Sequence, residues 1–215
     1  MSPKVIESSS FSDFINQVCS VTPKTHPPGR ATADAREFWI LQRAISNIIE
    51  ETSSRKWRLI HQDKPDFLLE IDEALVGIEV TEAVPQSLAQ FMSFENEQIY
   101  APMKFWREQS GAKRDRIRQM AAESLKEAGI GSDESERLLS ELICKRIADK
   151  TKKLEDGAIK KYTKNHLVIY DRGSPAGTKL DRVVSLILKN PKLVSTFDQV
   201  VLVSDGSCVN LRYQN

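Results

Sequence analysis

The chain has 215 residues, of which 40% are hydrophobic and 28% are charged, a composition typical of folded globular proteins and not of disordered or fibrous ones. Its formal net charge of +1 provides no overall basic field, so a nucleic-acid partner would have to be recognised through local clusters. Three cysteines without metal-ligand spacing, the lack of a signal-peptide core in residues 1–20 and the lack of any apolar run of about 18 residues predict a cytoplasmic protein without a membrane span.

Residues 1–33 are expected to form an N-terminal extension that ends in a proline-rich loop. A helix is then expected with Asp34 as its N-cap, extending to about residue 51. Asp34 and Glu37, three residues apart, resemble a capping box, in which the glutamate closes the helix start. Glu37 also lies in helical phase with Leu41 and Ile48, on the face that should pack against a sheet. Glu37 can therefore be a capping residue or a functional carboxylate.

A β-hairpin is expected over residues 65–82, after a short strand at residues 57–61. A turn at residues 72–73 places Asp66 directly opposite Glu79, where two like charges repel each other. The opposite face of the hairpin is uniformly apolar, with Phe67, Leu69, Ile71, Val76, Ile78 and Val80. Two facing carboxylates on an apolar layer suggest a divalent-cation site, because a hard cation bound by oxygens would relieve their repulsion.

The alternative for this hairpin is an antiparallel pair with one face in water, which alternates in the same way. That alternative explains the polarity of the face. It does not explain why Gly77 and Thr81, in place of longer solvated side chains, flank Glu79 on the carboxylate face.

The remaining elements are expected in this order: a helical insertion at residues 86–130, a helix at 135–155, a strand at 166–171, a helix at 182–189 and strands at 199–203 and 209–213. Together with the first helix and the hairpin they predict one α/β domain over residues 34–215. Its fold class is a mixed sheet flanked by helices, with the helical insertion after the third strand.

A lysine lies on the apolar stripe of the helix at 135–155. Lys150 shares that stripe with Ile143, Ile147 and Leu154. The ammonium group can serve a site, or the side chain can bury its stem and extend the charge to water. Lys153 projects elsewhere but could reach a site at the helix edge.

Asp66, preceded by a proline, and Glu79 thirteen residues later resemble the motif of the PD-(D/E)xK nuclease superfamily. The element order is similar to the core of that restriction-endonuclease-like fold. The resemblance implies that Asp66 and Glu79 bind Mg²⁺ or Mn²⁺ with the backbone carbonyl of Val80, and that Glu37 is the acidic residue of the first helix. It also implies a phosphodiester hydrolase that acts on DNA in preference to RNA, with a homodimer or a partner protein as a further option.

Thr81 stands where the family has its signature lysine, which orients the attacking water and stabilises charge on the phosphate. Some members of the superfamily carry this lysine on the following helix. Lys150 is therefore the first candidate for the role and Lys153 the second. Two other hypotheses stay open: a non-catalytic nucleic-acid-binding or protein-interaction module with the same fold, and an unrelated α/β domain whose hairpin imitates the motif.

A basic cluster with six positive and two negative residues lies within residues 104–118, interleaved with Phe105 and Trp106. Its candidate nucleic-acid-binding residues are Lys104, Arg107, Lys113, Arg114, Arg116 and Arg118. Cationic contacts to the phosphate backbone supply much of the affinity for nucleic acids. The alternative is an ordinary solvated helix surface.

Overall fold

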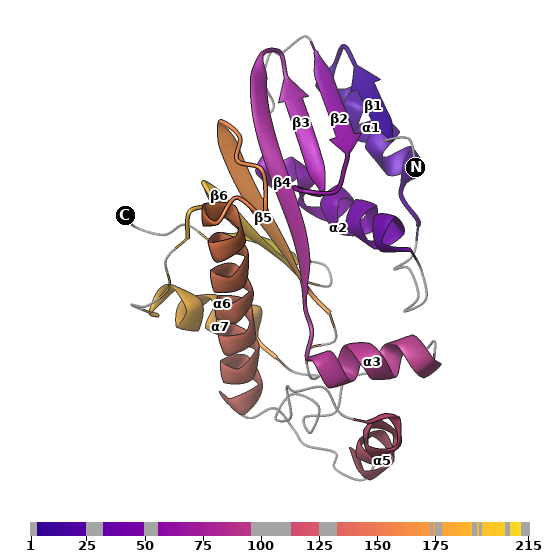
Figure 1. The fold of residues 1–215 in the computed structure, drawn as a ribbon, viewed down its shortest axis with the longest axis vertical. Helices are drawn as coiled ribbons and strands as arrows, with labels where there is room; N and C mark the ends of the chain where they lie inside the picture. Colours follow the sequence, from indigo (N-terminus) through magenta and orange to yellow (C-terminus); the bar gives the residue numbers. More distant parts are fainter. Residues whose placement is uncertain are drawn as a thin grey trace.

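One mixed β-sheet runs through the protein, with helices on both of its faces (Figure 1). The computed structural model describes residues 4–24, 32–49, 56–95, 113–124, 133–172, 174, 178–190, 193, 195–204 and 207–211. The predicted class, an α/β domain with a mixed sheet flanked by helices, is confirmed for this part of the chain.

The strands lie side by side in the order in which they occur in the chain. They are β1 (Val5–Ser8), β2 (Trp57–His61), β3 (Phe67–Ile71), β4 (Ala74–Ala83), β5 (Lys164–Asp171), β6 (Gln199–Ser204) and β7 (Ser207–Leu211). Neighbours from β1 to β4 are antiparallel, β4, β5 and β6 are mutually parallel, and β7 is antiparallel to β6.

The helices of the described residues are α1 (Phe11–Val21), α2 (Ala33–Ile48), α3 (Gln86–Glu95), α5 (Arg114–Ser124), α6 (Asp133–Glu155) and α7 (Leu180–Leu188). One buried apolar cluster joins α1 and α2 to one face of the sheet, and a second joins α6 and α7 to the other. Figure 1 shows α3 and α5 below the sheet, at one end of the molecule. Among the described helices, none combines the length and the apolar character needed to cross a bilayer.

Both parallel pairings are made through helical crossovers, because parallel neighbours cannot be joined by a tight turn. The chain passes from β4 to β5 through α6, and from β5 to β6 through α7. Since both helices cover the same face, α6 lies directly against β4 and faces α7. This connection brings the middle of α6 to the carboxylate face of the predicted hairpin.

The N-terminal residues belong to the sheet and to the core. β1 pairs with β2, with Val5 opposite Ile60. Phe14 and Val18 of α1 are fully buried, and Phe14 stacks on the ring of Trp57. The described residues of the expected extension therefore do not lie apart from the rest of the domain.

The first predicted helix begins two residues earlier than expected, and this changes the interpretation of Glu37. The N-cap is Thr32, whose side chain accepts a hydrogen bond from the Ala35 amide at 3.4 Å. The prediction that Asp34 is the N-cap is therefore wrong, because Thr32, two residues earlier, occupies the N-cap position. Glu37 is then two residues too far along the helix to close a capping box.

The hairpin register is confirmed. Ile71 pairs with Ala74 across the turn, and Phe67 pairs with Ile78 at the other end of the ladder. Extending this register by one position brings Asp66 beside Glu79. The face predicted to be apolar packs on α1 and α2, with Phe67, Leu69, Val76, Ile78 and Val80 buried and Ile71 partly buried.

Candidate metal centre

Three side chains predicted for the site come together on the α6 side of the hairpin. Asp66 immediately precedes β3, Glu79 lies in the middle of β4, and Lys150 lies in the second half of α6. Lys150 is held there by its apolar neighbours on α6, since Ile147 and Leu154 are buried in the core on that face. The helical phase predicted for Lys150 is therefore confirmed.

Glu79 is the buried centre of this group. Its side chain is only 6% exposed, and its Oε1 atom accepts a hydrogen bond from Lys150 Nζ at 2.5 Å. The other carboxylate oxygen, Oε2, is buried and has no hydrogen-bond partner among the described residues. Buried carboxylate oxygens are normally satisfied, so this oxygen is available to accept a further ligand.

Asp66 is anchored through both its backbone and its side chain. Its carbonyl accepts a hydrogen bond from the Gln62 amide at 2.9 Å, and its Oδ2 atom accepts one from the Val80 amide at 2.7 Å. Burial, followed by the negative charge of Glu79, raises the pKa of Asp66 to about 8. The Val80 hydrogen bond and the Lys150 charge oppose this rise in pKa without cancelling it. The carboxyl group of Asp66 is therefore held in a fixed orientation, although its surroundings disfavour its ionised form when no cation is nearby to compensate the charge.

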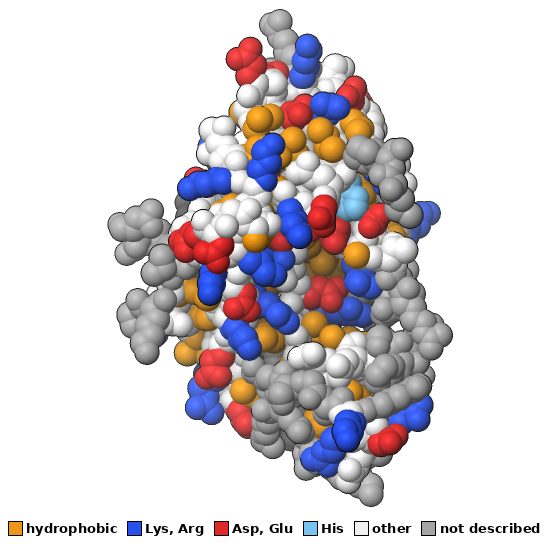
Figure 2. All heavy atoms as spheres, viewed as in Figure 1, with side chains coloured by type: hydrophobic (Ala, Val, Ile, Leu, Met, Phe, Trp, Pro, Cys, Tyr) orange, Lys and Arg blue, Asp and Glu red, His pale blue; other side chains and the backbone are white. Residues whose placement is uncertain are grey.

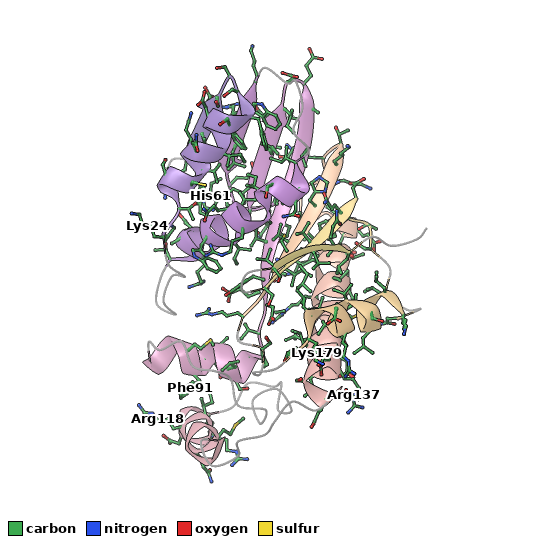
Figure 3. All side chains as sticks on the ribbon, turned by 180° about the vertical axis from the view of Figure 1, so that it is seen from behind. Lys24, His61, Phe91, Arg118, Arg137 and Lys179 are labelled. Carbon is green, nitrogen blue, oxygen red and sulfur yellow. The ribbon has the colours of Figure 1, made fainter. Side chains whose placement is uncertain are left out.

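Glu37 lies at the edge of the same site. It contacts His61, which the sequence pattern does not single out. Its Oε2 atom lies 2.8 Å from Nε2 of His61, the last residue of β2. The negative charge of Glu37 also contributes to the raised pKa of Asp66, so the two carboxylates are near each other. Asp34 completes a group of three potential ligands with Glu37 and His61. Figure 3 labels His61 beside α2.

Sequence signals for this second group exist but are weak. Asp34 and Glu37 are three residues apart and so share one helix face. His61 comes five residues before Asp66, at the end of a strand that runs antiparallel to β3. Neither spacing specifies a metal site, because the contact depends on how α2 packs on the sheet.

The remaining predicted residues are not all near the carboxylates. Lys153 is exposed on α6 and makes no ion pair within the described part of the chain. Thr81 is partly buried on β4, two residues after Glu79, and carries no charge. Val80 is buried, and its amide holds Asp66.

The basic cluster lies away from these residues. Lys113, Arg116 and Arg118 are exposed on or directly before α5, and Figure 3 shows Arg118 at the end of the molecule remote from His61. Lys104 and Arg107 lie outside the described residues, as does the side chain of Arg114. On the face shown in Figure 2, basic and acidic side chains are mixed, without a large patch of one sign among the residues drawn in colour.

Gly77, on the carboxylate face, allows an aromatic ring to brace the site. A Cβ atom at this position would lie 2.9 Å from Cδ2 of Tyr162 and 3.1 Å from Cγ of Pro65. The Tyr162 hydroxyl accepts a hydrogen bond from Gln62 at 3.4 Å. Because Gly77 has no side chain, Tyr162 and Pro65 can pack on β4, next to Asp66.

Substituting Gly77 by alanine is expected to lower the free energy of unfolding by about 1–3 kcal/mol, because the added methyl overpacks two ring systems that cannot easily give way. Urea denaturation measures this change. Ala74→Ser, at an exposed position in the same hairpin, should change stability by less than about 0.5 kcal/mol. Equal stability of Gly77→Ala and the wild type would contradict the packing described here.

The arrangement suits a divalent cation better than it suits an isolated charge network. Asp66 and Glu79 offer two adjacent carboxylates, and one buried oxygen of Glu79 has no hydrogen-bond partner among the described residues. Burial, and then the negative charge of Glu79, make ionisation of Asp66 unfavourable, and the single charge of Lys150 does not offset these two effects. Oxygen ligands in this number match Mg²⁺, which keeps several waters and takes only one or two protein carboxylates.

Comparisons of the chain with protein-family models, with curated proteins and with solved structures gave no match. Inference about function therefore depends on the residues and on the geometry of the site itself.

Proposed function

We propose that this chain is a metal-dependent nuclease of the PD-(D/E)xK type that hydrolyses phosphodiester bonds, with DNA as its substrate in preference to RNA. The observation that carries the proposal is the buried carboxylate of Glu79. One of its oxygens is paired with Lys150. The other has no hydrogen-bond partner in the part of the chain that the structure describes, and it lies near the carboxyl group of Asp66, which resists ionisation. Such a group needs a cation that Lys150 alone does not provide.

The arrangement of elements supports the same proposal. Helix α2, the antiparallel strands β2, β3 and β4, helix α6 and the parallel strand β5 follow one another in the order of the restriction-endonuclease-like core. Residues 1–21, α3, α5 and the region after β5 would then be additions to that core. This similarity is one of topology, and the side chains at the site are a separate line of support.

The proposed ligands are the carboxylates of Asp66 and Glu79 and the backbone carbonyl of Val80, with Glu37 at the edge. A bound Mg²⁺ or Mn²⁺ would polarise the scissile phosphate and lower the pKa of a water molecule. The chain contributes the positions of the ligands. The Val80 amide orients the carboxylate of Asp66, and burial between β4 and α6 fixes that of Glu79.

Lys150 would supply the positive charge that Thr81 cannot supply. Its ammonium group is 2.5 Å from Glu79 Oε1, although it comes from α6 and not from the strand. Its side chain is 18% exposed, so it remains accessible to a phosphate group that enters from solvent. Positioned next to the carboxylates, it would stabilise the negative charge that develops on the phosphate.

Contact with the nucleic acid would extend beyond this centre. The exposed basic residues of α5 lie far enough away that only a polymeric substrate could reach both regions. Alternatively, a second subunit or a partner protein would supply the additional contacts with the substrate. These contacts affect affinity, whereas the chemistry depends on the carboxylates and Lys150.

A cleavage assay tests the proposal. Plasmid, linear and single-stranded DNA, together with an RNA of matched sequence, are incubated with the protein and Mg²⁺ or Mn²⁺. Cleavage is expected with wild-type protein and is expected to be lost in Asp66→Ala and Glu79→Ala, while the exposed-site control Asp63→Ala keeps it. Metal-dependent DNA binding without cleavage would favour the non-catalytic module. Cleavage that persists in both acid variants would refute the assigned site.

A further inference from the structure

We infer that Asp34, Glu37 and His61 form a second cation site, distinct from the centre at Asp66 and Glu79, which selects a transition-metal ion such as Zn²⁺. One ligand atom from each of the three side chains lies within 4.8 Å of the others. This site does not require that the protein be a nuclease.

The fold holds these ligands from two directions. Asp34 and Glu37 project from the same face of the first turns of α2, because they are three residues apart. His61 projects from the end of β2, and its ring packs against those of Phe38 and Phe67, with centroids at 5.2 and 5.0 Å. The imidazole is only 13% exposed. Aromatic packing therefore fixes the direction in which Nε2 points before any ion arrives.

The ligand types determine which ion would bind. One imidazole nitrogen and two carboxylate oxygens, with water in a fourth position, is a ligand set that zinc takes in proteins. Mg²⁺ favours oxygen ligands only, so His61 distinguishes this site from the neighbouring one. Tetrahedral zinc needs donor atoms about 3.4 Å apart. From the 4.8 Å limit the widest pair would close by up to about 1.4 Å, and Glu37 and His61, now 2.8 Å apart, would separate by about 0.6 Å, both within the range of a side-chain adjustment.

The carboxylates around the cluster supply a second reason to expect an ion. Asp34 and Glu37 bring two carboxylates together beside one imidazole. The hydrogen bond between Glu37 and His61 pairs two of these three groups, whereas the Asp34 carboxylate has no hydrogen bond or ion pair within the described part of the chain.

Calorimetric titration of the full chain with Zn²⁺, in the presence of excess Mg²⁺, tests this inference. One Zn²⁺ is expected to remain bound in the presence of Mg²⁺. His61→Gln and Asp34→Asn should each weaken its binding at least about tenfold, the scale on which even outer-shell partners change metal affinity. Asp63→Asn, at an exposed acid, and Cys19→Ser, at an exposed thiol, should not change it.

Substituting Co²⁺ for Zn²⁺ gives an independent readout, because its visible spectrum reports a nitrogen ligand. That spectrum should change in His61→Gln and be retained in Asp66→Ala. Zn²⁺ affinity that is unaffected by both His61→Gln and Asp34→Asn would overturn the second site. Complete displacement of Zn²⁺ by Mg²⁺ would also overturn the second site. Neither result depends on whether the protein cleaves DNA, so failure here is distinguishable from failure of the proposed nuclease activity.

Discussion

Replacing Lys150 by methionine is expected to reduce the rate of metal-dependent cleavage about 10²–10³-fold, the usual cost of removing one group that stabilises charge in a transition state. Methionine keeps the length and packing of the side chain on α6 and removes only the charge. The metal ligands stay in place, so Mg²⁺ binding should persist. Single-turnover cleavage at saturating Mg²⁺ measures the effect on the chemical step.

The control for this substitution is Lys153→Met, which removes an exposed lysine from the same helix and should leave the rate unchanged. Lys150→Arg, which keeps the charge, should retain more activity than the methionine variant. Loss of the ammonium group leaves the buried Glu79 charge without its partner, so the metal-free variant should also be less stable. Circular dichroism under assay conditions separates this effect from the catalytic one. A Lys150→Met enzyme with the wild-type rate would show that Lys150 does not replace the missing family lysine.

The affinity for Mg²⁺ is expected to rise about tenfold for each unit of pH up to about pH 8 and to level off above it. The pKa of Asp66 is about 8 because the carboxyl group is buried beside Glu79. Below this pH the carboxyl group carries a proton that the incoming ion must displace, so each unit of lower pH weakens binding by the same factor. Above it, the carboxylate is already ionised and pH has no further effect on this group. Between pH 6 and pH 8 the affinity should therefore change by about two orders of magnitude.

Isothermal titration calorimetry over this pH range measures the dependence, and repeating it in buffers of different ionisation enthalpy counts the protons released. Close to one proton should be released per ion at pH 6.5. Asp66→Asn cannot ionise, so it should bind Mg²⁺ weakly and with little dependence on pH in this range. A wild-type affinity that is constant from pH 6 to pH 8 would contradict the protonated state assigned to Asp66.

The hairpin could be predicted from the sequence because the residues that determine its pairing lie close together in the chain. Alternation over residues 67–71 and 74–83, with Leu68 and Leu75 among the apolar exceptions on the carboxylate face, assigns the side chains to faces. The short turn then leaves one register that buries the apolar set. Asp72 adopts a positive φ of 51°, which the turn requires and which aspartate tolerates. The position of Lys150 followed from helical phase for a similar reason, since its neighbours on the stripe have to be buried.

Features that depend on contacts between distant segments were not predictable. The pairing of β1 with β2 joins residues 49 to 55 positions apart, and four residues of β1 carry too little pattern to reveal it. The start of α2 was misplaced because threonine and aspartate are both good N-caps, and the choice between them is made by the chain that leads into the helix. The contact between His61 and Glu37 requires α2 to pack across the end of β2, a relation that neither segment encodes alone.

The most direct test of the central claim is the location of Mn²⁺ by anomalous diffraction from crystals of the protein grown with the ion. The account predicts an anomalous peak at about 2.0–2.3 Å from carboxylate oxygens of both Asp66 and Glu79, with Lys150 still beside the site. The oxygen of Glu79 that has no partner among the described residues should be one of the ligands. A protein that cleaves DNA with Mn²⁺ but shows no peak between these two carboxylates would contradict the account.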